Sequence, residues 1–166
     1  MITEPLTLPS GLVLRNRLAK AALTEALASP DGMPTPALLR YSRLLSEGGA
    51  GLYLTGNVMV DRRYVERAGN VIIEDDTELE ALSRWADSIQ GQGTAALVQL
   101  SHPGRQVNRL HSGRPVAPSA GEAVHVMGFF AAPRALEVAE IRDVIARFVR
   151  AAQVIERTGF AGVQVH

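Results

Sequence analysis

The feature of this sequence that most constrains its fold is a repeat, in which a short apolar segment is followed by a longer segment with helical periodicity. Four apolar segments have the composition and length of β-strands: residues 17–22, 51–55, 94–100 and 159–166. A helical pattern occupies each interval between them. Because a crossover helix returns the chain to the end of the sheet where it started, such units build parallel sheets. The repeat therefore predicts an α/β fold.

Capping residues mark where the predicted helices begin. Thr35 is a suitable N-cap, and Pro36 follows it at the first helical position. Asp75 or Asp76 is expected to cap the second helix. The third helix is expected over residues 137–157, where apolar side chains recur at helical spacing.

Two parallel architectures compete, an open doubly wound sheet and a closed eight-stranded barrel. A doubly wound sheet would favour a Gly-x-Gly-x-x-Gly turn after the first strand, but the residues after Ala22 are Leu-Thr-Glu-Ala-Leu. A β-hairpin is predicted before that strand, with arms at residues 6–8 and 12–14, and it could plug the bottom of a barrel. Both observations favour a partial TIM (β/α)8 barrel, made of the first four βα units and an N-terminal β-hairpin.

Composition excludes several classes of partner and site. Lys plus Arg and Asp plus Glu number 17 each, so net charge gives no reason to expect nucleic acid or an anionic membrane as a partner. The absence of cysteine excludes disulfides and thiolate metal sites. The N-terminus lacks the pattern of a signal peptide, and no apolar run approaches the roughly 20 residues of a membrane span. We therefore expect a cytoplasmic protein.

The predicted strand ends could form one ligand site, because ligands of such barrels bind at the C-terminal ends of the strands. The first two strands end in small residues, around Ala22 and Gly56, which would let a flat ring lie close to the backbone. Gln99 ends the third strand and suits the edge of a heterocycle with adjacent N–H and C=O groups. His166 ends the fourth strand and can donate a hydrogen bond to an oxyanion.

Five stretches of the chain carry a resemblance to a known family. They are LRNRLAKAALT (14–24), GGAGLYLTGN (48–57), VQLSHPGR (98–105), APSA (117–120) and GFAGVQVH (159–166). Their order and spacing resemble the N-terminal half of the old yellow enzyme family of FMN-dependent NAD(P)H oxidoreductases. The resemblance is greatest to the branch that includes 2,4-dienoyl-CoA reductases and NADH:flavin oxidoreductases.

The resemblance implies FMN at the mouth of a barrel and assigns residues to it. The implied FMN contacts are Ala22, Leu23, Thr24, Gly56 and Gln99. Among them, Thr24 would lie near the reactive edge of the flavin and Gln99 would bind its pyrimidine edge. His166 would match the first histidine of the His-x-x-His or His-x-x-Asn pair that holds the carbonyl oxygen of the substrate.

The reaction implied by the resemblance has two half-reactions. NADH or NADPH would reduce FMN, and the reduced flavin would reduce the activated C=C bond of an enone, enoate or dienoyl substrate. The second member of the histidine pair and the phosphate site for FMN would lie beyond residue 166.

Residues 1–166 are accordingly interpreted as the N-terminal half of a single FMN-binding barrel domain, truncated after the fourth strand. A barrel of this class needs about 250 residues, and half of one leaves two open sheet edges. We expect the isolated chain to be inactive, to bind FMN weakly and to form homo-oligomers. The alternative is a non-catalytic half-barrel that needs a complementary chain to bind ligand. An unrelated barrel, such as a phosphate-sugar isomerase, would leave the matches at the strand ends unexplained.

The other polar residues are assigned structural roles. His102 and Arg105 are expected to organise their loop, and residues 61–63 are expected to form a solvated loop. His111 and His125 lack the spacing of metal ligands, so no metal site is predicted.

Overall fold

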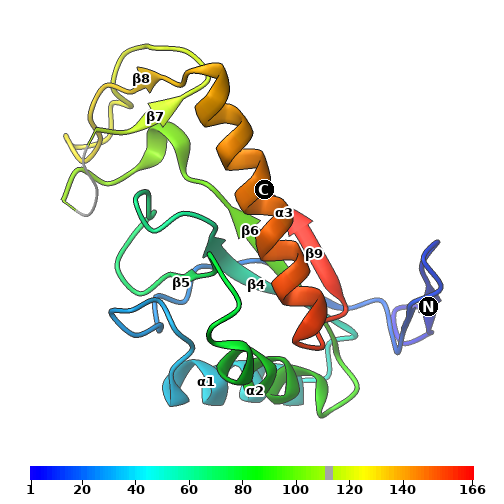
Figure 1. The fold of residues 1–166 in the computed structure, drawn as a ribbon. Coiled ribbons are helices and arrows are strands. Elements are labelled where there is room, and N and C mark those ends of the chain that lie inside the picture. Colours follow the sequence, from blue (N-terminus) through cyan, green and yellow to red (C-terminus); the bar gives the residue numbers. More distant parts are fainter. Residues whose placement is uncertain (111–113) are drawn as a thin grey trace.

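A parallel sheet, in which β4 and β6 lie side by side, forms the centre of the molecule (Figure 1). The computed structural model describes residues 1–110 and 114–166. The main strands are β3 (Ala19–Lys20), β4 (Leu52–Met59), β6 (Ala95–Ser101) and β9 (Gly162–Val165). Their order in the sheet, β3-β4-β6-β9, is their order in the chain. A doubly wound sheet would reverse this order at a switch point, so the fold is that of the first four βα units of a barrel, as predicted.

The short strand β5 (Val71–Ile72) also pairs with β4 in parallel. It pairs with the end of β4 that carries Val58 and Met59, whereas β3 pairs with the beginning of β4. The strand β4 therefore extends well beyond residue 55, where the sequence pattern predicted its end.

In the described part of the chain, three α-helices connect the strands: α1 (Pro36–Glu47), α2 (Leu79–Gln90) and α3 (Val138–Arg157). As predicted, Thr35 caps α1, because its hydroxyl oxygen accepts a hydrogen bond from the backbone N–H of Leu38 at 3.2 Å. Glu137 caps α3 in a reciprocal capping box with Glu140, close to the predicted start.

The predicted cap of α2 is wrong. The helix begins at Leu79, and neither Asp75 nor Asp76 is its N-cap residue. The carboxylate of Asp75 instead accepts hydrogen bonds from the backbone N–H and the hydroxyl of Thr77. Such a local turn is the usual competitor of a helix cap for an aspartate, and here it forms just before the helix.

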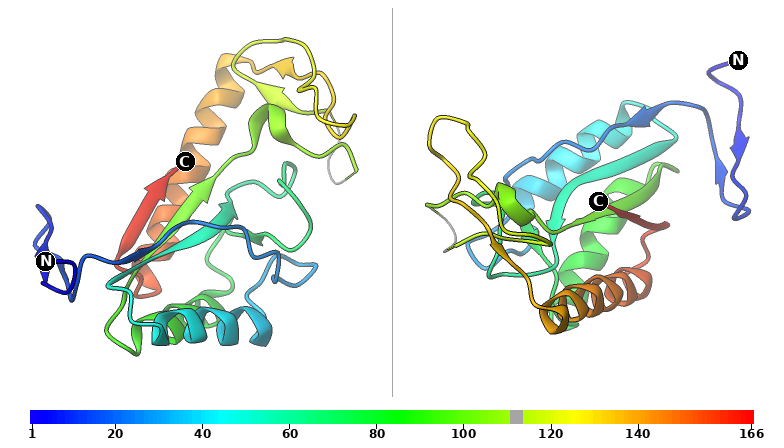
Figure 2. Two further views of the ribbon diagram at one scale, coloured as in Figure 1. Left: turned by 180° about the vertical axis from the view of Figure 1, so that it is seen from behind. Right: turned by 90° about the horizontal axis from the view of Figure 1, so that it is seen from above.

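The helices pack on one face of the sheet, and the hydrophobic core lies between them and the strands (Figure 2). Tyr53 and Val98 point into this core, where Trp85 of α2 is almost completely buried. The indole ring of Trp85 meets the ring of Phe160 edge-on, with centroids 5.5 Å apart. Side chains alternate between the two faces along each strand. Leu54 and Leu97, the neighbours of Tyr53 and Val98, therefore point to the opposite face, where they are only half-buried.

The N-terminal hairpin forms as predicted, from β1 (Leu6–Thr7) and β2 (Val13–Leu14). It lies away from the sheet, beyond the end where the strands begin (Figure 1). Arg15 joins it to that end, since its guanidinium donates hydrogen bonds to the carbonyl of Ala50 and to the hydroxyl of Thr94. The hairpin is therefore remote from the C-terminal ends of the strands.

A long connection between β6 and α3 rises above the C-terminal ends of the strands (Figure 1). It contains the short 3₁₀ helix η1 (Gly104–Gln106) and two paired strands, β7 (Val116–Ala117) and β8 (Arg134–Ala135). Among residues 1–110 and 114–166, no helix combines the length and the apolar character that a membrane span requires.

Candidate functional site

A cavity of about 640 Å³ opens at the C-terminal ends of the strands. Its walls come from β4 and the connection after it, from the loop after β6, and from the end of β9. The lining residues are Asn57, Glu66, Arg67, Ser101, His102, Pro103, Gln106, Asn108, Val126, Phe129, Phe130 and His166. The volume is in the range of small-molecule sites, so the cavity is the candidate functional site.

A row of three amide side chains crosses the inner face of the sheet next to this cavity. Asn57 of β4 is the register partner of Gln99 of β6, which is in turn the partner of Gln164 of β9. The amide nitrogen of Gln99 donates a hydrogen bond to Oε1 of Gln164 at 2.6 Å. Register pairing of parallel strands thus places three amides on one face, opposite the face that the helices cover.

Glu66 joins this row to the end of the first strand. Its Oε2 accepts hydrogen bonds from Nδ2 of Asn57 at 2.8 Å and from the hydroxyl of Thr24 at 3.1 Å. Burial acts to raise the pKa of the Glu66 carboxyl, but these bonds and the charge of Arg67 hold that pKa below its ordinary value. Glu66 is therefore ionised at neutral pH.

The predicted residues of the first strand form a surface next to this cluster. Ala22 and Thr24 are half-buried, while Leu23 is 64% exposed. Gly56 packs directly against them, since a Cβ at this position would lie 2.4 Å from the carbonyl oxygen of Leu23 and 2.7 Å from Cα of Thr24. Gly56 is thus required for β4 to approach the residues that follow β3.

The largely buried ion pair of Lys20 and Glu25 holds the same segment in place. Nζ of Lys20 lies 2.8 Å from Oε1 of Glu25, and the backbone N–H of Gly56 donates to Oε2 of Glu25 at 3.2 Å. Glu25 therefore connects the segment that contains Thr24 both to Lys20 of β3 and to the backbone of β4.

The structure brings Thr24, Gln99 and His166 to one end of the sheet. His166 lines the cavity, and its backbone N–H donates to the carbonyl of Leu100 on β6. Gly56 lies beside them, but Asn57, the residue after it, is the one whose position faces the cavity. The strand-end residues of four separate segments therefore converge.

Sequence reasoning missed three residues of this site. Asn57 was missed because β4 continues to Met59, and only a strand of that length shows Asn57 to be an inner-face residue. Glu66 lies in an irregular connection, where no periodic signal marks it. Gln164 could have been found from its place in the fourth strand, two residues before His166.

His102 organises its loop, as predicted, and it also lines the cavity. Its Nδ1 accepts a hydrogen bond from the backbone N–H of Gly104 at 3.1 Å, and Arg105 donates to the carbonyl of Glu122, so both residues organise their loop as predicted. Burial lowers the pKa of the His102 imidazole, which keeps the ring neutral with its proton on Nε2. Within the described residues this buried Nε2 has no partner, although His102 lines the cavity.

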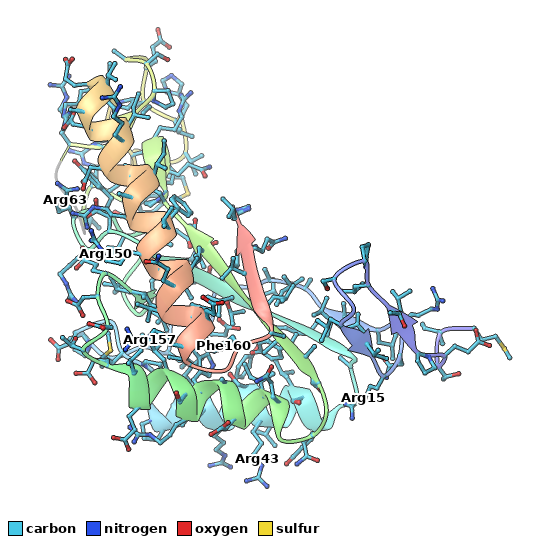
Figure 3. The ribbon with its side chains drawn as sticks, turned by 45° about the vertical axis from the view of Figure 1, so that its right-hand side comes forward. Arg15, Arg43, Arg63, Arg150, Arg157 and Phe160 are labelled. Atoms are coloured by element: carbon cyan, nitrogen blue, oxygen red, sulfur yellow. The ribbon has the colours of Figure 1, made fainter. Side chains whose placement is uncertain are left out.

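The expectation of a solvated loop at residues 61–63 is correct for Arg62 and Arg63, which are exposed, but wrong for Asp61. Asp61 is only 1% exposed and lies in an ion-pair cluster with Arg63, whose Nη2 is 2.6 Å from its Oδ2. The same Arg63 nitrogen reaches Asp143 of α3 at 2.8 Å, and Arg147 of α3 also approaches Asp61. Figure 3 shows Arg63 beside this helix. The connection between β4 and β5 contains Glu66, and this cluster attaches that connection to α3.

Within residues 1–110 and 114–166, no group of three His, Asp or Glu side chains could hold a metal ion. His111, one of the histidines considered from the sequence, lies outside the described residues.

Comparison with family models places this geometry among flavin-dependent enzymes. Residues 2–166 match the model of the NADH:flavin oxidoreductase / NADH oxidase family. The match covers nearly the whole chain and includes every segment that contributes to the cavity.

Curated relatives carry names of the same kind. An NADH-dependent flavin oxidoreductase of Hypocrea jecorina is 38% identical over 184 aligned residues, which cover 98% of this chain and 45% of the relative. An NADH:fumarate oxidoreductase of Klebsiella pneumoniae is 35% identical, over 99% of this chain and 18% of the relative.

Solved structures show the same fold. The old yellow enzyme homologue from Zymomonas mobilis superposes with a TM-score of 0.87 at 27% identity, over 99% of this chain and 48% of that one. Morphinone reductase in complex with tetrahydroNAD superposes with a TM-score of 0.86 at 28% identity, with the same coverage. The chain thus spans at most about half the length of these relatives, and the predicted cofactors, FMN and a nicotinamide hydride donor, are confirmed at the level of the family.

Proposed function

Because the chain belongs to the NADH:flavin oxidoreductase / NADH oxidase family, we propose that its protein is an FMN-dependent NAD(P)H oxidoreductase of the ene-reductase type. It reduces the activated C=C bond of α,β-unsaturated carbonyl or dienoyl compounds, with NADH or NADPH as the hydride donor. The observation that carries this proposal is the cavity lined by Asn57 and His166, with Gln99 beside Asn57 in the sheet and Thr24 bonded to the lining residue Glu66. We further propose a cytoplasmic enzyme.

The residues at the strand ends fit a flavin by their chemistry. Amide side chains on the inner face can match the alternating N–H and C=O groups of a pyrimidine edge. Ala22 and Gly56 are small, and the exposed Leu23 offers an apolar surface to a ring. We therefore assign FMN binding to Ala22, Leu23, Thr24, Gly56 and Gln99. When bound, FMN would accept a hydride from the nicotinamide and deliver it to the substrate.

His166 is proposed to bind the carbonyl oxygen of the substrate. Its position at the wall of the cavity allows an imidazole N–H to donate a hydrogen bond to an oxygen that becomes negative during the reaction. Such donors act most strongly where water is excluded, and Phe129 and Phe130 of the long connection line the same cavity.

We propose that residues 1–166 act as the N-terminal half of a single FMN-binding barrel domain. The half-exposed inner face of the sheet supports this assignment, because the closed barrel of this fold covers that face with further strands. The same observation also favours a second candidate, a non-catalytic half-barrel that binds ligand only together with a complementary chain.

Flavin content and activity test the proposal. The protein is expressed from its complete reading frame, reconstituted with FMN, and assayed with NADH or NADPH and 2-cyclohexenone. We expect one bound FMN per chain and oxidation of the nicotinamide that depends on the enone. Protein that stays colourless after reconstitution would contradict the proposal. Flavin binding that appears only after a second polypeptide is added would favour the complementary half-barrel.

A further inference from the structure

We propose that Asn57 is a ligand-binding residue that accepts an N–H from an amide-type group of a bound ligand, and that Glu66 is the positioning residue that orients its side chain. This inference rests on the proposed function and names a specificity determinant of the same site. It concerns two residues that the strand-end pattern alone does not reveal.

The contact with Glu66 decides which way the amide of Asn57 points. Nδ2 of Asn57 donates to Oε2 of Glu66 at 2.8 Å. The flipped amide would place its oxygen against a carboxylate oxygen, and two acceptors repel each other. Glu66 is ionised at neutral pH, so it selects the orientation in which the nitrogen of Asn57 faces it and Oδ1 faces away.

Glu66 is itself held in place, so it can act as a fixed partner. The hydroxyl of Thr24 donates to the same carboxylate oxygen at 3.1 Å, and Arg67 lies 2.9 Å from Oε1. Asn70 joins this connection to β4, because its Nδ2 donates to the backbone carbonyl of Asn57 and its Oδ1 accepts from the backbone N–H of Arg67. These contacts hold both the Glu66 carboxylate and its loop in a fixed position relative to Asn57.

The oriented amide leaves one acceptor without a partner. Oδ1 of Asn57 is buried and, within the described residues, has no hydrogen-bond donor. Buried polar atoms of folded proteins are nearly always paired, since an unpaired one loses its hydration without compensation. Asn57 lines the cavity of about 640 Å³, so a donor on a bound ligand is the partner that this oxygen requires.

The chemistry of that donor is an N–H next to a carbonyl group, either within a conjugated ring or in a carboxamide attached to one. The neighbouring Gln99, which also belongs to the amide row, suits the same functional group. Two ligands of the proposed reaction carry it, the pyrimidine ring of FMN and the carboxamide of the nicotinamide. A binding experiment can test each ligand in a separate arm.

Binding of paired analogues tests the inference without use of activity. In the first arm, apoprotein from the complete reading frame is titrated with FMN and with 3-methyl-FMN, which lacks the ring N–H. In the second arm, FMN-loaded protein is titrated with unreactive tetrahydro-NAD and with its analogue that carries an acetyl group in place of the carboxamide. In at least one arm we expect the wild type to prefer the N–H ligand by about tenfold.

Four variants separate recognition from positioning. Asn57→Leu should bring the preference in that arm close to one, because it removes the acceptor but keeps the backbone bond to Asn70. Glu66→Ala should reduce the preference strongly, because it releases the amide, whereas Glu66→Gln should keep it, because the glutamine oxygen can still accept from Asn57. Gln92→Leu, which removes an amide near the opposite end of the sheet, is the control and should leave the preference unchanged.

The outcomes distinguish the inference from the proposed function. A wild type without preference in both arms, or a preference that persists in Asn57→Leu, overturns the inference and leaves the flavoenzyme assignment intact. Full preference in Glu66→Ala overturns the role of Glu66. A wild type that binds no FMN overturns the proposed function, and this inference with it. Circular dichroism of each variant confirms that the fold is retained.

Discussion

The buried hydroxyl group of Ser42 stabilises the hydrophobic core between the helices and the sheet. The hydroxyl of Ser42 accepts a hydrogen bond from the indole N–H of Trp85 at 2.9 Å and lies 3.4 Å from the phenol oxygen of Tyr53. Burial raises the pKa of the Tyr53 phenol well above its usual range, so this side chain stays protonated. Ser42 therefore satisfies two large aromatic residues that point into the core from different elements.

Replacement of Ser42 by alanine should destabilise the protein. Ser42→Ala leaves the buried indole N–H of Trp85 without an acceptor, and an unpaired buried donor costs about 1–3 kcal/mol. Urea unfolding measures the difference, with Ser83→Ala on the partly exposed surface of α2 as the control. Equal unfolding free energies for the two variants would show that Ser42 does not have this role.

Asp61 should make the stability of the protein depend on pH. Burial acts to raise the pKa of its carboxyl, but hydrogen bonds from Arg63 and the charge of Arg147 hold that pKa below the ordinary value. A depressed folded-state pKa means that the stabilisation is complete above the unfolded value of about 3.9 and is lost as the pH falls through the folded value.

The variant Asp61→Asn should lose about 1–3 kcal/mol at pH 7. Arg63, which is largely exposed, remains hydrated in the variant, so the loss is smaller than for a fully buried ion pair. Unfolding curves measured from pH 7 down to pH 3 should show the wild type converging on the variant. A constant difference across this range would contradict the explanation.

At the scale of elements, the start of α1 is set by one side chain. Thr35 caps the helix and also donates its hydroxyl hydrogen to the carbonyl of Leu27. Thr35→Ala should lower the unfolding free energy by about 1 kcal/mol, and Thr35→Ser should retain most of it. A serine variant as unstable as the alanine variant would assign the effect to packing of the methyl group rather than to the cap.

Local signals predicted most elements, and long-range contacts explain the errors. Thr35 and Pro36 locate α1 because capping and the fixed φ of proline act within one helical turn. Asp75 misled the prediction because the same carboxylate can cap a helix or close a turn, and Thr77 decides between them. The burial of Asp61 depends on α3, about 80 residues later in the chain, so no local pattern indicates it.

The candidate site divides in the same way. Thr24, Gln99 and His166 were predicted because each lies at the end of a predicted strand, within a stretch that resembles the family. Asn57 and Glu66 were not, because their importance arises from contacts between β4, the connection after it and the segment after β3. Prediction from local pattern thus identified the ends of the strands but not the contacts that connect them.

At the scale of the whole molecule, apolar surface remains uncovered on both the sheet and α3. Val138, Ile145 and Val149 of α3 are each more than half exposed. The inner face of the sheet is only half-buried at Leu54 and Leu97. Exposed apolar patches and open sheet edges favour association.

The 166-residue chain studied alone should therefore self-associate and bind FMN weakly. Light scattering should report oligomers, and the double variant Ile145→Lys with Val149→Lys should shift them toward the monomer. Flavin fluorescence should show little quenching at micromolar FMN. A monomeric chain that binds FMN tightly in a one-to-one ratio would contradict both expectations.

Two matched glutamine variants test most directly whether the strand ends form one flavin site, and the quantity to measure is their affinity for FMN. Gln99 lies in the amide row beside the cavity, whereas Gln92 lies near the opposite end of the sheet, where its carbonyl accepts from Arg15. In protein from the complete reading frame, Gln99→Leu should weaken FMN binding by about tenfold, and Gln92→Leu should bind FMN as the wild type does. Wild-type affinity in both variants would contradict the assignment.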